Sequence, residues 1–446
     1  MGRHAATAGS SRHGPEAPAP PPSAPLDYWR TALVTRATQA VEDDDKLDVV
    51  LACRPVFTKN QDVAAFELLL HGGDSAQGAS LSDIEATSSV ILGTYTHIFQ
   101  GGKVQSISTF LRVTDEVLLA PELPDLPKKQ YILEVAARDK VSGALVDRLR
   151  SLGRRGYRLA LAGFEPDNPA LDVLLGVVHI VKLDIATLGL ERLQQAVEKL
   201  KPYGLDLLAD NLHRREDFGR CMGLGFTYYQ GDFLSQPYPV KGKKIAGNKL
   251  VLLQLLSELH NPHATPSTLE EIAIKDANLT YRILKIVNSA ALGFGKEVDS
   301  LSHAIALLGM EEIKRWANLF LVDGEKDKPA ELTRSMLVRG RMCEILAELS
   351  GKSRPVNHFI VGLLSRLDAL MDISMEELMR QVPLSQDVKA ALVHRQGDLG
   401  EILNEVEHYE SGRFEALRWL LDKSYYEVAY RHSTAWAQQV QQAMGR

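Results

Sequence analysis

Two patterns of hydrophobic and polar positions divide the chain. In the first, short apolar runs alternate with segments of helical period, such as Ser142–Leu152 and Leu190–Leu200. The apolar runs predict strands at Val49–Val56, Ala64–Leu70, Val104–Phe110, Tyr131–Ala136, Tyr157–Ala162, His179–Ile185 and Leu205–Ala209. Runs that are apolar on both faces indicate a parallel sheet. So many strand–helix units favour a TIM-like (β/α) barrel, with a doubly wound sheet as the alternative that the pattern leaves open.

The second pattern begins after Pro237-Tyr238-Pro239, where the spacing of apolar residues changes to that of helices. Val251, Leu252, Leu255 and Leu259 follow this spacing, and no alternating pattern returns before the end of the chain. The sequence therefore predicts an α/β barrel followed by an all-α half.

Length and local composition give the domain boundaries. A chain of 446 residues exceeds the size at which one hydrophobic core keeps growing, so two domains are expected. The first 25 or so residues are rich in Pro, Ala, Ser and Gly, and such a segment cannot bury enough apolar area to fold. We predict a disordered tail at 1–45, a barrel at 46–239, a linker at 240–248 that contains Lys241, Lys243 and Lys244, and a helical domain at 249–442.

Charge and cysteine content narrow the environment and the partners. The net charge of −6 gives no overall field for nucleic acid or an anionic membrane; Arg282, Lys285, Lys314 and Arg315 form the one local basic set. Three scattered cysteines suit a reducing compartment, and neither a secretory signal nor a membrane-length apolar stretch is found. We expect a cytoplasmic protein without membrane or nucleic-acid partners.

The candidate chemistry lies at the ends of the predicted strands, because phosphate-binding loops, nucleophile elbows and metal-ligating histidine spacings are absent from the sequence. In a parallel barrel the carboxyl ends of the strands meet on one face, where active sites form. Any one polar residue there could instead cap a helix, but seven follow in order. They are Glu67, Ser106, Glu134, Lys182, Asp184, Asp210 and Gln230.

These residues resemble the motifs of the EAL family of cyclic-di-GMP phosphodiesterases, over about Leu51 to Pro239. The matching stretches are Arg54-Pro55-Val56, Glu67-Leu68-Leu69, Leu133-Glu134, Lys182-Leu183-Asp184 and Tyr229-Gln230-Gly231 with Pro237. They are similar to the family's Q-P-(I/V), E-A-L, E-(L/I)-T-E, K-x-D and Q-G-(Y/F)…P motifs. The resemblance implies a site where carboxylates and an Asn hold two Mg²⁺ or Mn²⁺ ions that activate water against a phosphodiester.

The departures from the family fall on those metal ligands. Ser106 stands for the Asn, Ala162-Gly163 for an Asp-Asp pair, Ala137 for the second Glu of E-x-T-E, and Asp210 and His213 for two further glutamates. Sets of catalytic groups that act together fail when members are lost. We therefore expect no catalytic residues, no metal and no cofactor, with Glu67, Glu134, Lys182, Asp184 and Asp210 as vestiges of the site.

Whether the barrel still binds cyclic-di-GMP stays open at this point. Arg54, Glu67, Lys182 and Gln230 are the ligand-binding candidates. Arg54 replaces the family's opening Gln, and the metals that would neutralise the nucleotide's phosphates have lost their ligands.

The second half resembles the HDOD family, a relative of HD-domain metal phosphohydrolases, over about Lys249 to Gln442. The stretches 279–290 and 300–309, followed by Lys314-Arg315-Trp316, carry the resemblance. Where HD hydrolases have their metal-binding His-Asp pair, Ser365-Arg366 follows Gly362-Leu363-Leu364, and the cation Arg366 opposes metal binding. His303 and His358 are expected to be packing or surface residues.

The sequence thus predicts a non-catalytic signalling protein. The degenerate EAL barrel would act as a sensor or docking module, and the HDOD domain would engage protein partners. The alternative is an active cyclic-di-GMP phosphodiesterase, which would need Mg²⁺ or Mn²⁺ at the barrel.

Overall fold

A computed structural model describes residues 50–71, 97–100, 103–237, 300–322 and 328–444 apart from a few single positions, together with scattered positions between 251 and 284. The predicted tail at 1–45 and the predicted linker at 240–248 lie outside the described residues, as do Arg282 and Lys285.

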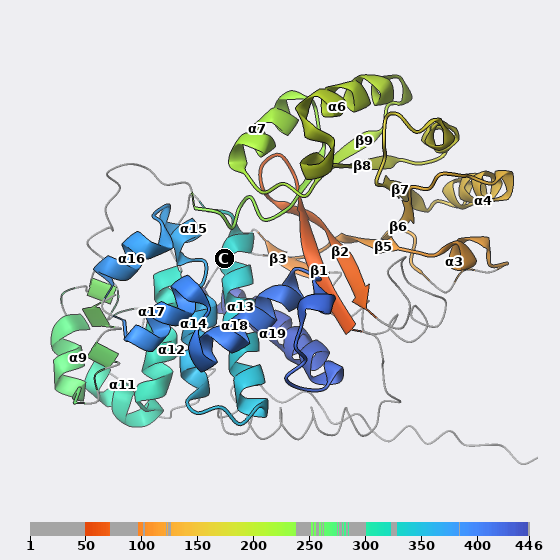
Figure 1. Ribbon diagram of the computed structural model, residues 1–446. Helices are drawn as coiled ribbons and strands as arrows, with labels where there is room; N and C mark the ends of the chain where they lie inside the picture. The colour runs from red at the N-terminus through yellow and green to blue at the C-terminus, as the bar shows by residue number, and fades with distance from the viewer. Residues whose placement is uncertain are drawn as a thin grey trace, which may run out of the picture.

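Eight strands of the first half close into a barrel, as predicted (Figure 1). In chain order they are β1 (Val50–Phe57), β2 (Val63–His71), β5 (Ser108–Arg112), β6 (Tyr131–Ala136), β7 (Arg158–Ala162), β8 (Ile180–Asp184), β9 (Asp206–Asp210) and β10 (Tyr228–Gln230). Around the barrel they follow the order β1-β10-β9-β8-β7-β6-β5-β2. The closed order excludes the doubly wound sheet.

One strand runs against the others. β1 is antiparallel to both neighbours, β2 and β10, whereas every other pair in the barrel is parallel. A tight turn makes this direction possible: the Thr58 amide donates to the Asp62 carbonyl at 2.8 Å, and Gln61 adopts the left-handed conformation with φ 66°. The prediction of a wholly parallel sheet is wrong for β1, because a hairpin replaces the expected crossover helix.

The predicted strand Val104–Phe110 is in fact two strands of different sheets. Its first part is β4 (Lys103–Ser106), which pairs with β3 (His97–Gln100) in a separate two-stranded sheet. Its second part belongs to β5, which reaches Arg112. The barrel strand therefore begins and ends later than predicted.

Among the described residues, five α-helices follow strands of the barrel and cover its outer face. They are α3 (Asp115–Leu119), α4 (Gly143–Arg154), α5 (Asp172–Leu175), α6 (Ile185–Leu200) and α7 (Arg215–Gly223). Side-chain oxygens cap three of them: Thr114 accepts from Val117, Ser142 from Leu145 and Asp184 from Thr187. The predicted helices Ser142–Leu152 and Leu190–Leu200 are confirmed within α4 and α6.

An apolar layer fills the inside of the barrel. Seven strands each contribute one buried side chain to it, and Tyr228 of β10 packs against the set. The seven are Val56, Ala65, Phe110, Ile132, Ala160, Ile180 and Leu208. Such layers make a small barrel a packed core rather than a channel.

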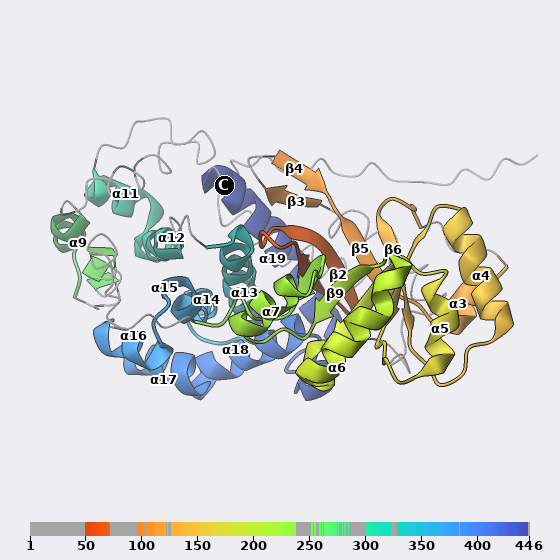
Figure 2. The ribbon, with the colours of Figure 1, turned by 90° about the horizontal axis from the view of Figure 1, so that it is seen from above.

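The described part of the second half is helical, as predicted. Its helices are α9 (Pro266–Ala273), α11 (Leu301–Leu308), α12 (Met310–Val322), α13 (Ala330–Leu349), α14 (Pro355–Leu364), α15 (Leu367–Met371), α16 (Met375–Gln381), α17 (Gln386–His394), α18 (Gly397–Glu410) and α19 (Lys423–Met444). Helix α13 lies at the centre, with most of its side chains buried between α14, α18 and α19 (Figure 2).

The helical half packs directly on the barrel. Both α18 and α19 contact β1, and Figures 1 and 2 show α19 running beside the β1–β2 hairpin. No outer helix of the described part of the barrel covers this hairpin, so helices of the second domain take that place.

The close approach of α13 and α14 depends on Gly362. A Cβ at this position would lie 2.8 Å from the Arg339 carbonyl oxygen and 2.9 Å from the Cys343 Sγ. We expect Gly362→Ala to lower the free energy of unfolding by about 1–3 kcal/mol, because the helices must separate to admit the methyl group.

Urea unfolding of the full chain, followed by tryptophan fluorescence, measures this loss, since three of the four tryptophans lie in the helical half. Gly219→Ala on α7 is the control, because its Cβ would meet nothing within 4 Å. Equal stability of the two variants would contradict the packing argument.

Candidate functional site

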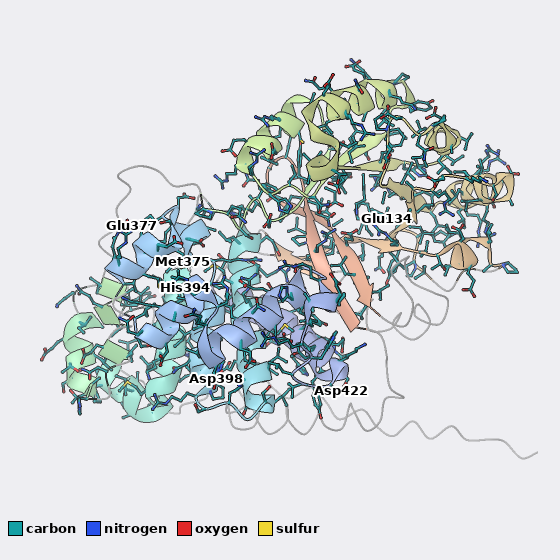
Figure 3. All side chains as sticks on the ribbon, in the orientation of Figure 1. Glu134, Met375, Glu377, His394, Asp398 and Asp422 are labelled. Carbon is teal, nitrogen blue, oxygen red and sulfur yellow. The ribbon has the colours of Figure 1, made fainter. Side chains whose placement is uncertain are left out.

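A second layer of side chains lies above the apolar layer, and each strand of the barrel contributes one residue to it. Every member is two positions from a residue of the apolar layer or, on β10, from Tyr228, which packs against that layer. In a strand, residues i and i+2 face the same side. The members are Arg54, Glu67, Arg112, Glu134, Ala162, Lys182, Asp210 and Gln230. We call this set the charged layer; Figure 3 labels Glu134 within the barrel.

Lys182 lies at the centre of the charged layer. Its Nζ donates to Glu67 Oε1 at 2.6 Å and to Glu134 Oε2 at 2.8 Å, and it lies 3.8 Å from Asp210 Oδ2. The residue is only 2% exposed, and burial alone would lower its pKa. The carboxylates of Glu134 and Glu67 outweigh burial and raise the pKa above the usual range, so the ammonium stays charged.

Two arginines complete the neutralisation of these carboxylates. Arg54 Nη2 lies 2.6 Å from Glu67 Oε2 and 3.7 Å from Asp210 Oδ1, while Arg112 Nε donates to Glu134 Oε1 at 2.7 Å. The neighbouring carboxylates raise the pKa of both guanidinium groups despite their burial. Three cations thus face three acidic side chains, and the layer carries no net charge if all six are ionised.

Sequence reasoning missed Arg112 and chose Ser106 instead. Ser106 ends β4, is exposed and lies outside the barrel sheet, so it has no place in the charged layer. Arg112 is the residue of β5 that pairs across from Glu134. The alternation that continues two positions beyond the apolar Phe110 is the signal that would have found it.

Burial shifts the pKa values of Glu67 and Asp210, the two acids that lie near both Lys182 and Arg54, with different outcomes. Burial raises the pKa of Glu67, but Lys182 and Arg54 overcome this effect and hold the pKa well below its usual range. For Asp210, burial exceeds the effect of the more distant Lys182, and the pKa is raised. Glu67 is therefore more firmly ionised than Asp210.

The mouth of the barrel is the end at which the charged layer lies. Gln230 and Asp184 occupy different places around it. The Gln230 side chain is fully buried and donates from Nε2 to Glu67 Oε2 at 2.9 Å, while its Oε1 meets no partner among the described residues. Asp184 lies outside the charged layer: its Oδ1 caps α6, and its Oδ2 accepts from Asn211 Nδ2 at 2.9 Å. Of the predicted candidates, Arg54, Glu67, Glu134, Lys182, Asp210 and Gln230 come together, and Asp184 stands beside them.

The positions that lack the expected acids also cluster. The Ala137 amide donates to the Ala162 carbonyl at 2.8 Å, and a Cβ on Gly163 would lie 3.6 Å from the Ala137 Cβ. These three residues therefore form a corner of the mouth, beside β6 and β7, without a single side-chain oxygen.

A hollow of about 320 Å³ opens next to the mouth, between α6 and α7. Its lining includes Asn211, His213, Arg214 and Cys221, but no member of the charged layer. Arg214 is paired with Asp217 at 2.9 Å, and burial raises the pKa of the Cys221 thiol to about 12. The hollow therefore presents no reactive thiolate, and two of its arginines, Arg214 and Arg220, share the single carboxylate of Asp217.

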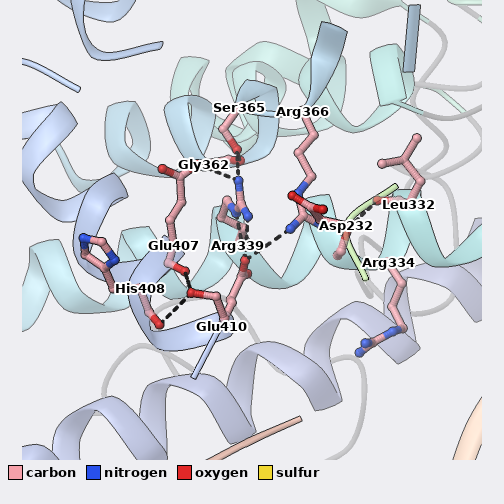
Figure 4. Close-up of polar contacts among 12 residues, drawn as sticks. Asp232, Leu332, Arg334, Arg339, Gly362, Ser365, Arg366, Glu407, His408 and Glu410 are labelled. Atoms are coloured by element: carbon pink, nitrogen blue, oxygen red, sulfur yellow. Dashed lines mark hydrogen bonds and ion pairs between the residues drawn. The ribbon is translucent and has the colours of Figure 1, made fainter. Parts of the chain in front are cut away.

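In the helical half, Ser365 and Arg366 belong to a network of ion pairs (Figure 4). Arg339 donates from Nη1 to Ser365 Oγ and to Glu407 Oε1, both at 2.9 Å, and from Nη2 to Glu410 at 2.8 Å. Arg366 donates to Ser335 Oγ at 2.6 Å and lies 3.8 Å from Glu410. Burial and the neighbouring Arg339 lower the pKa of Arg366 to about 10, so it remains a cation at neutral pH.

Other polar residues of the helical half have structural surroundings. Arg315 is paired with Glu312 and Glu344, so this member of the predicted basic set is engaged within the domain. His358 on α14 is buried, and burial lowers its pKa. Of the two roles expected for His358, packing or surface, the structure shows packing.

The donors in the barrel do not fit a pair of divalent metals. Mg²⁺ and Mn²⁺ require several unencumbered oxygen ligands, yet Lys182, Arg54 and Arg112 occupy the oxygens of Glu67 and Glu134. Among the residues that the structure describes, no group of three or more His, Cys, Asp or Glu side chains is arranged to hold a metal ion.

Comparisons with known proteins agree with this architecture. The HDOD domain family model matches residues 249–435. The uncharacterized protein YuxH of Bacillus subtilis is 26% identical over 408 residues, covering 89% of this chain and 99% of that protein. The cyclic di-GMP phosphodiesterase CdgJ of Vibrio cholerae is 27% identical over 380 residues, covering 84% and 88%.

Solved structures similar to this chain include EAL domains. One is an EAL domain protein from Listeria monocytogenes, with 14% identity, a TM-score of 0.32 and coverage of 46% of this chain and 91% of that one. Another is the FimX EAL domain from Pseudomonas aeruginosa bound to c-di-GMP, with 15% identity, a TM-score of 0.31 and coverage of 47% and 94%.

The second half of the chain is an HDOD domain. With the closed barrel and its ordered motifs in front, the chain has an EAL-HDOD architecture and is related over most of its length to the cyclic di-GMP phosphodiesterase CdgJ. None of the helices described in the structure is both long and apolar enough to span a membrane.

The charged layer predicts a large effect of removing Lys182. Lys182→Met leaves Glu67 and Glu134 buried with unbalanced charge, so we expect the free energy of unfolding at pH 7 to fall by about 3–5 kcal/mol. Lys201→Met is the control, because Lys201 is exposed and its substitution is expected to change stability by less than about 0.5 kcal/mol.

The pH dependence of this loss provides a second check. In the wild type the lowered pKa of Glu67 contributes stability that is present above the unfolded-state pKa and is lost on acidification. In the variant, protonation of the carboxylates that Lys182 no longer neutralises relieves their repulsion. The difference in free energy of unfolding between wild type and variant should therefore narrow as the pH falls from 7 toward 4.5. Denaturant unfolding at several pH values measures this difference; a constant difference would contradict the ion-pair assignment.

Proposed function

We propose that this protein is a non-catalytic member of its class, in which the barrel serves as a sensor or docking module. One observation carries the proposal: the carboxylates at the barrel mouth are neutralised by Lys182, Arg54 and Arg112. Phosphodiester hydrolysis by two metals requires those oxygens to be available to the ions.

Metal entry would have to displace protein cations that are already well placed. The Lys182 ammonium is buried between two carboxylates, and each arginine holds one of them at 2.6–2.7 Å. Displacing the Lys182 ammonium leaves it without its counter-charges in a desolvated site, which costs several kcal/mol. The corner at Ala137, Ala162 and Gly163 offers no replacement oxygen from a side chain.

The same arrangement argues against tight binding of cyclic-di-GMP through these residues. Arg54 and Lys182 are the candidate cations for its phosphates, but both are bound to Glu67. The balance of three cations and three acids provides little net attraction for a dianion. We therefore propose that cyclic-di-GMP is at most a weak ligand of the mouth, with Gln230 as its remaining uncharged candidate.

We further propose that the HDOD domain conveys the output by binding protein partners. Arg366, rather than an Asp, stands beside Ser365, and its cationic state is incompatible with a catalytic metal there. Arg315, a member of the basic set considered for nucleic acid, is engaged by two glutamates. The three cysteines are unpaired thiols, which supports the cytoplasmic location expected from the sequence.

The second candidate function is cyclic-di-GMP hydrolysis. It is favoured by the likeness to the Vibrio cholerae phosphodiesterase CdgJ, which extends over 84% of this chain. At 27% identity this likeness concerns the architecture. Hydrolysis depends on individual ligands, and several of these differ from the EAL motifs, among them Ala137 and Ala162-Gly163.

An assay for the linear dinucleotide product separates the two functions. The purified full chain is incubated with cyclic-di-GMP and Mg²⁺ or Mn²⁺, with CdgJ as the positive control. We expect no turnover above that of a Glu67→Gln variant, because the oxygen ligands that the metals need are occupied by protein cations. We also expect no rise in thermal stability on adding Mn²⁺ alone.

Turnover that is lost in Glu67→Ala would overturn the proposal in favour of the phosphodiesterase. Calorimetric titration with cyclic-di-GMP tests the nucleotide separately. We expect no saturable heat at tens of micromolar nucleotide, and a saturable signal reduced in Gln230→Ala would contradict the weak-ligand proposal.

A further inference from the structure

Strand β1 is shared between the barrel mouth and the helical domain. Arg54 reaches Glu67 in the charged layer. On the same strand, the Leu51 carbonyl accepts a hydrogen bond from the Tyr409 phenol of α18, and the Cys53 carbonyl accepts one from the Tyr430 phenol of α19 at 3.3 Å. The site and the interface therefore use residues one to three positions apart.

The two carbonyls lie along an edge of β1 that the barrel leaves incomplete. β2 pairs with β1 along its whole length, but in the described chain β10 reaches only Val56 and Phe57. Peptide groups two residues apart point to the same side of a strand, so the carbonyls of Leu51 and Cys53 share one edge. The phenols of the helical domain thus complete hydrogen bonding that β10 is too short to provide.

The interface extends onto β2, the second strand of the hairpin. The Arg334 guanidinium, held by both oxygens of Glu331 at 2.6 and 2.7 Å, lies 5.2 Å from the centre of the Phe66 ring on β2. A Cβ on Gly412 would lie only 2.4 Å from Leu69 Cδ1, which shows how closely the loop after α18 approaches β2. Phe66 adjoins Glu67, the partner of Arg54, so both strands of the hairpin contact the helices.

The phenols are held in place by their own surroundings. Tyr409 and Tyr430 are buried, with ring centroids 5.3 Å apart, and Tyr409 also packs against Tyr426 and Phe414. The Cys53 thiol, within 3.7 Å of the Tyr430 hydroxyl, has its pKa raised to about 12 by burial and remains neutral. A shift of β1 along its axis would therefore break the hydrogen bonds that Tyr409 and Tyr430 donate to its carbonyls.

We propose that Tyr409 and Tyr430 are positioning residues that hold β1 in the register at which Arg54 meets Glu67, so that the barrel mouth and the HDOD helices are energetically coupled through this strand. The inference rests on the proposed sensor function, for which it supplies the route from the barrel to the helical domain. Coupling of this kind is reciprocal: a change at either end alters the other.

Hydrogen–deuterium exchange of the full chain tests the first direction. The Tyr409→Phe/Tyr430→Phe double variant keeps the rings and removes the two hydroxyls. We expect amide exchange in 50–57 and in the facing part of β2 to become at least about fivefold faster, because each of the two lost hydrogen bonds contributes about 1 kcal/mol. Tyr426→Phe is the matched control, because its hydroxyl contacts Glu405 and Leu420 within the helical domain.

The reverse direction uses a change at the mouth. Arg54→Gln removes the ion pair with Glu67, and we expect exchange in α19 around Tyr430 to become about twofold faster or more. Arg54→Lys, which keeps the charge, should restore most of the protection. Arg158→Gln is the control for loss of a barrel arginine, since Arg158 pairs with Asp206 on β7 and β9, which pack against the barrel's own helices α4 and α6.

Unchanged exchange of β1 in the tyrosine variant would overturn the proposal, as would an effect of Arg54→Gln confined to the barrel, or equal effects of the control variants. The measurement uses neither nucleotide nor metal. If the chain hydrolyses cyclic-di-GMP, the proposed function fails while the exchange result stands; if exchange is unchanged, the coupling fails and the hydrolysis assay is unaffected.

Discussion

The rest of the barrel mouth depends on the buried ammonium of Lys182. It lies between Glu67 and Glu134, and without it two desolvated carboxylates would repel each other inside the barrel. Arg54 and Arg112 each approach one of these acids from the outer side, so the acids keep their positions without any metal. The acids of this layer are thus held by protein cations, among which Lys182 matches the K-x-D motif of the EAL family and Arg54 replaces the Gln of its opening motif.

The helical domain contains a similar network of arginines and acids in a different fold. Arg366 stands at the position where the resemblance to HD hydrolases places a metal-binding Asp, and Arg339 connects Ser365 with two glutamates of α18. In both halves a guanidinium group contacts two acidic side chains, Arg54 in the barrel and Arg339 in the helical domain. These acids would otherwise be available to a free cation. A guanidinium has fixed charge and five directed donors, so it maintains such a network across the physiological pH range.

The sequence predicted the barrel because strands β6, β7, β8 and β9 are apolar on both faces, and their bounds agree to within about one residue. It misjudged β1, since a hairpin and a crossover start with the same apolar run and differ only in the turn around Gln61. It also placed Ser106 rather than Arg112 near the site, because the apolar segment from Val104 continues through a break between two sheets. Motif spacing identified Arg54 and Lys182 as site residues, but which acids they would neutralise depends on neighbours far away in the sequence.

The shortness of β10 has a consequence for the isolated barrel domain. Apart from the helical domain, β1 would present unsatisfied carbonyls along an exposed strand edge, with the apolar side chains of Leu51, Phe66 and Leu68 beside it. Such edges recruit strands from other molecules and lead to self-association. A gene fragment that encodes the barrel alone is therefore expected to yield aggregates, and an evolutionary exchange of domains in this architecture would have to carry the hairpin and its covering helices together.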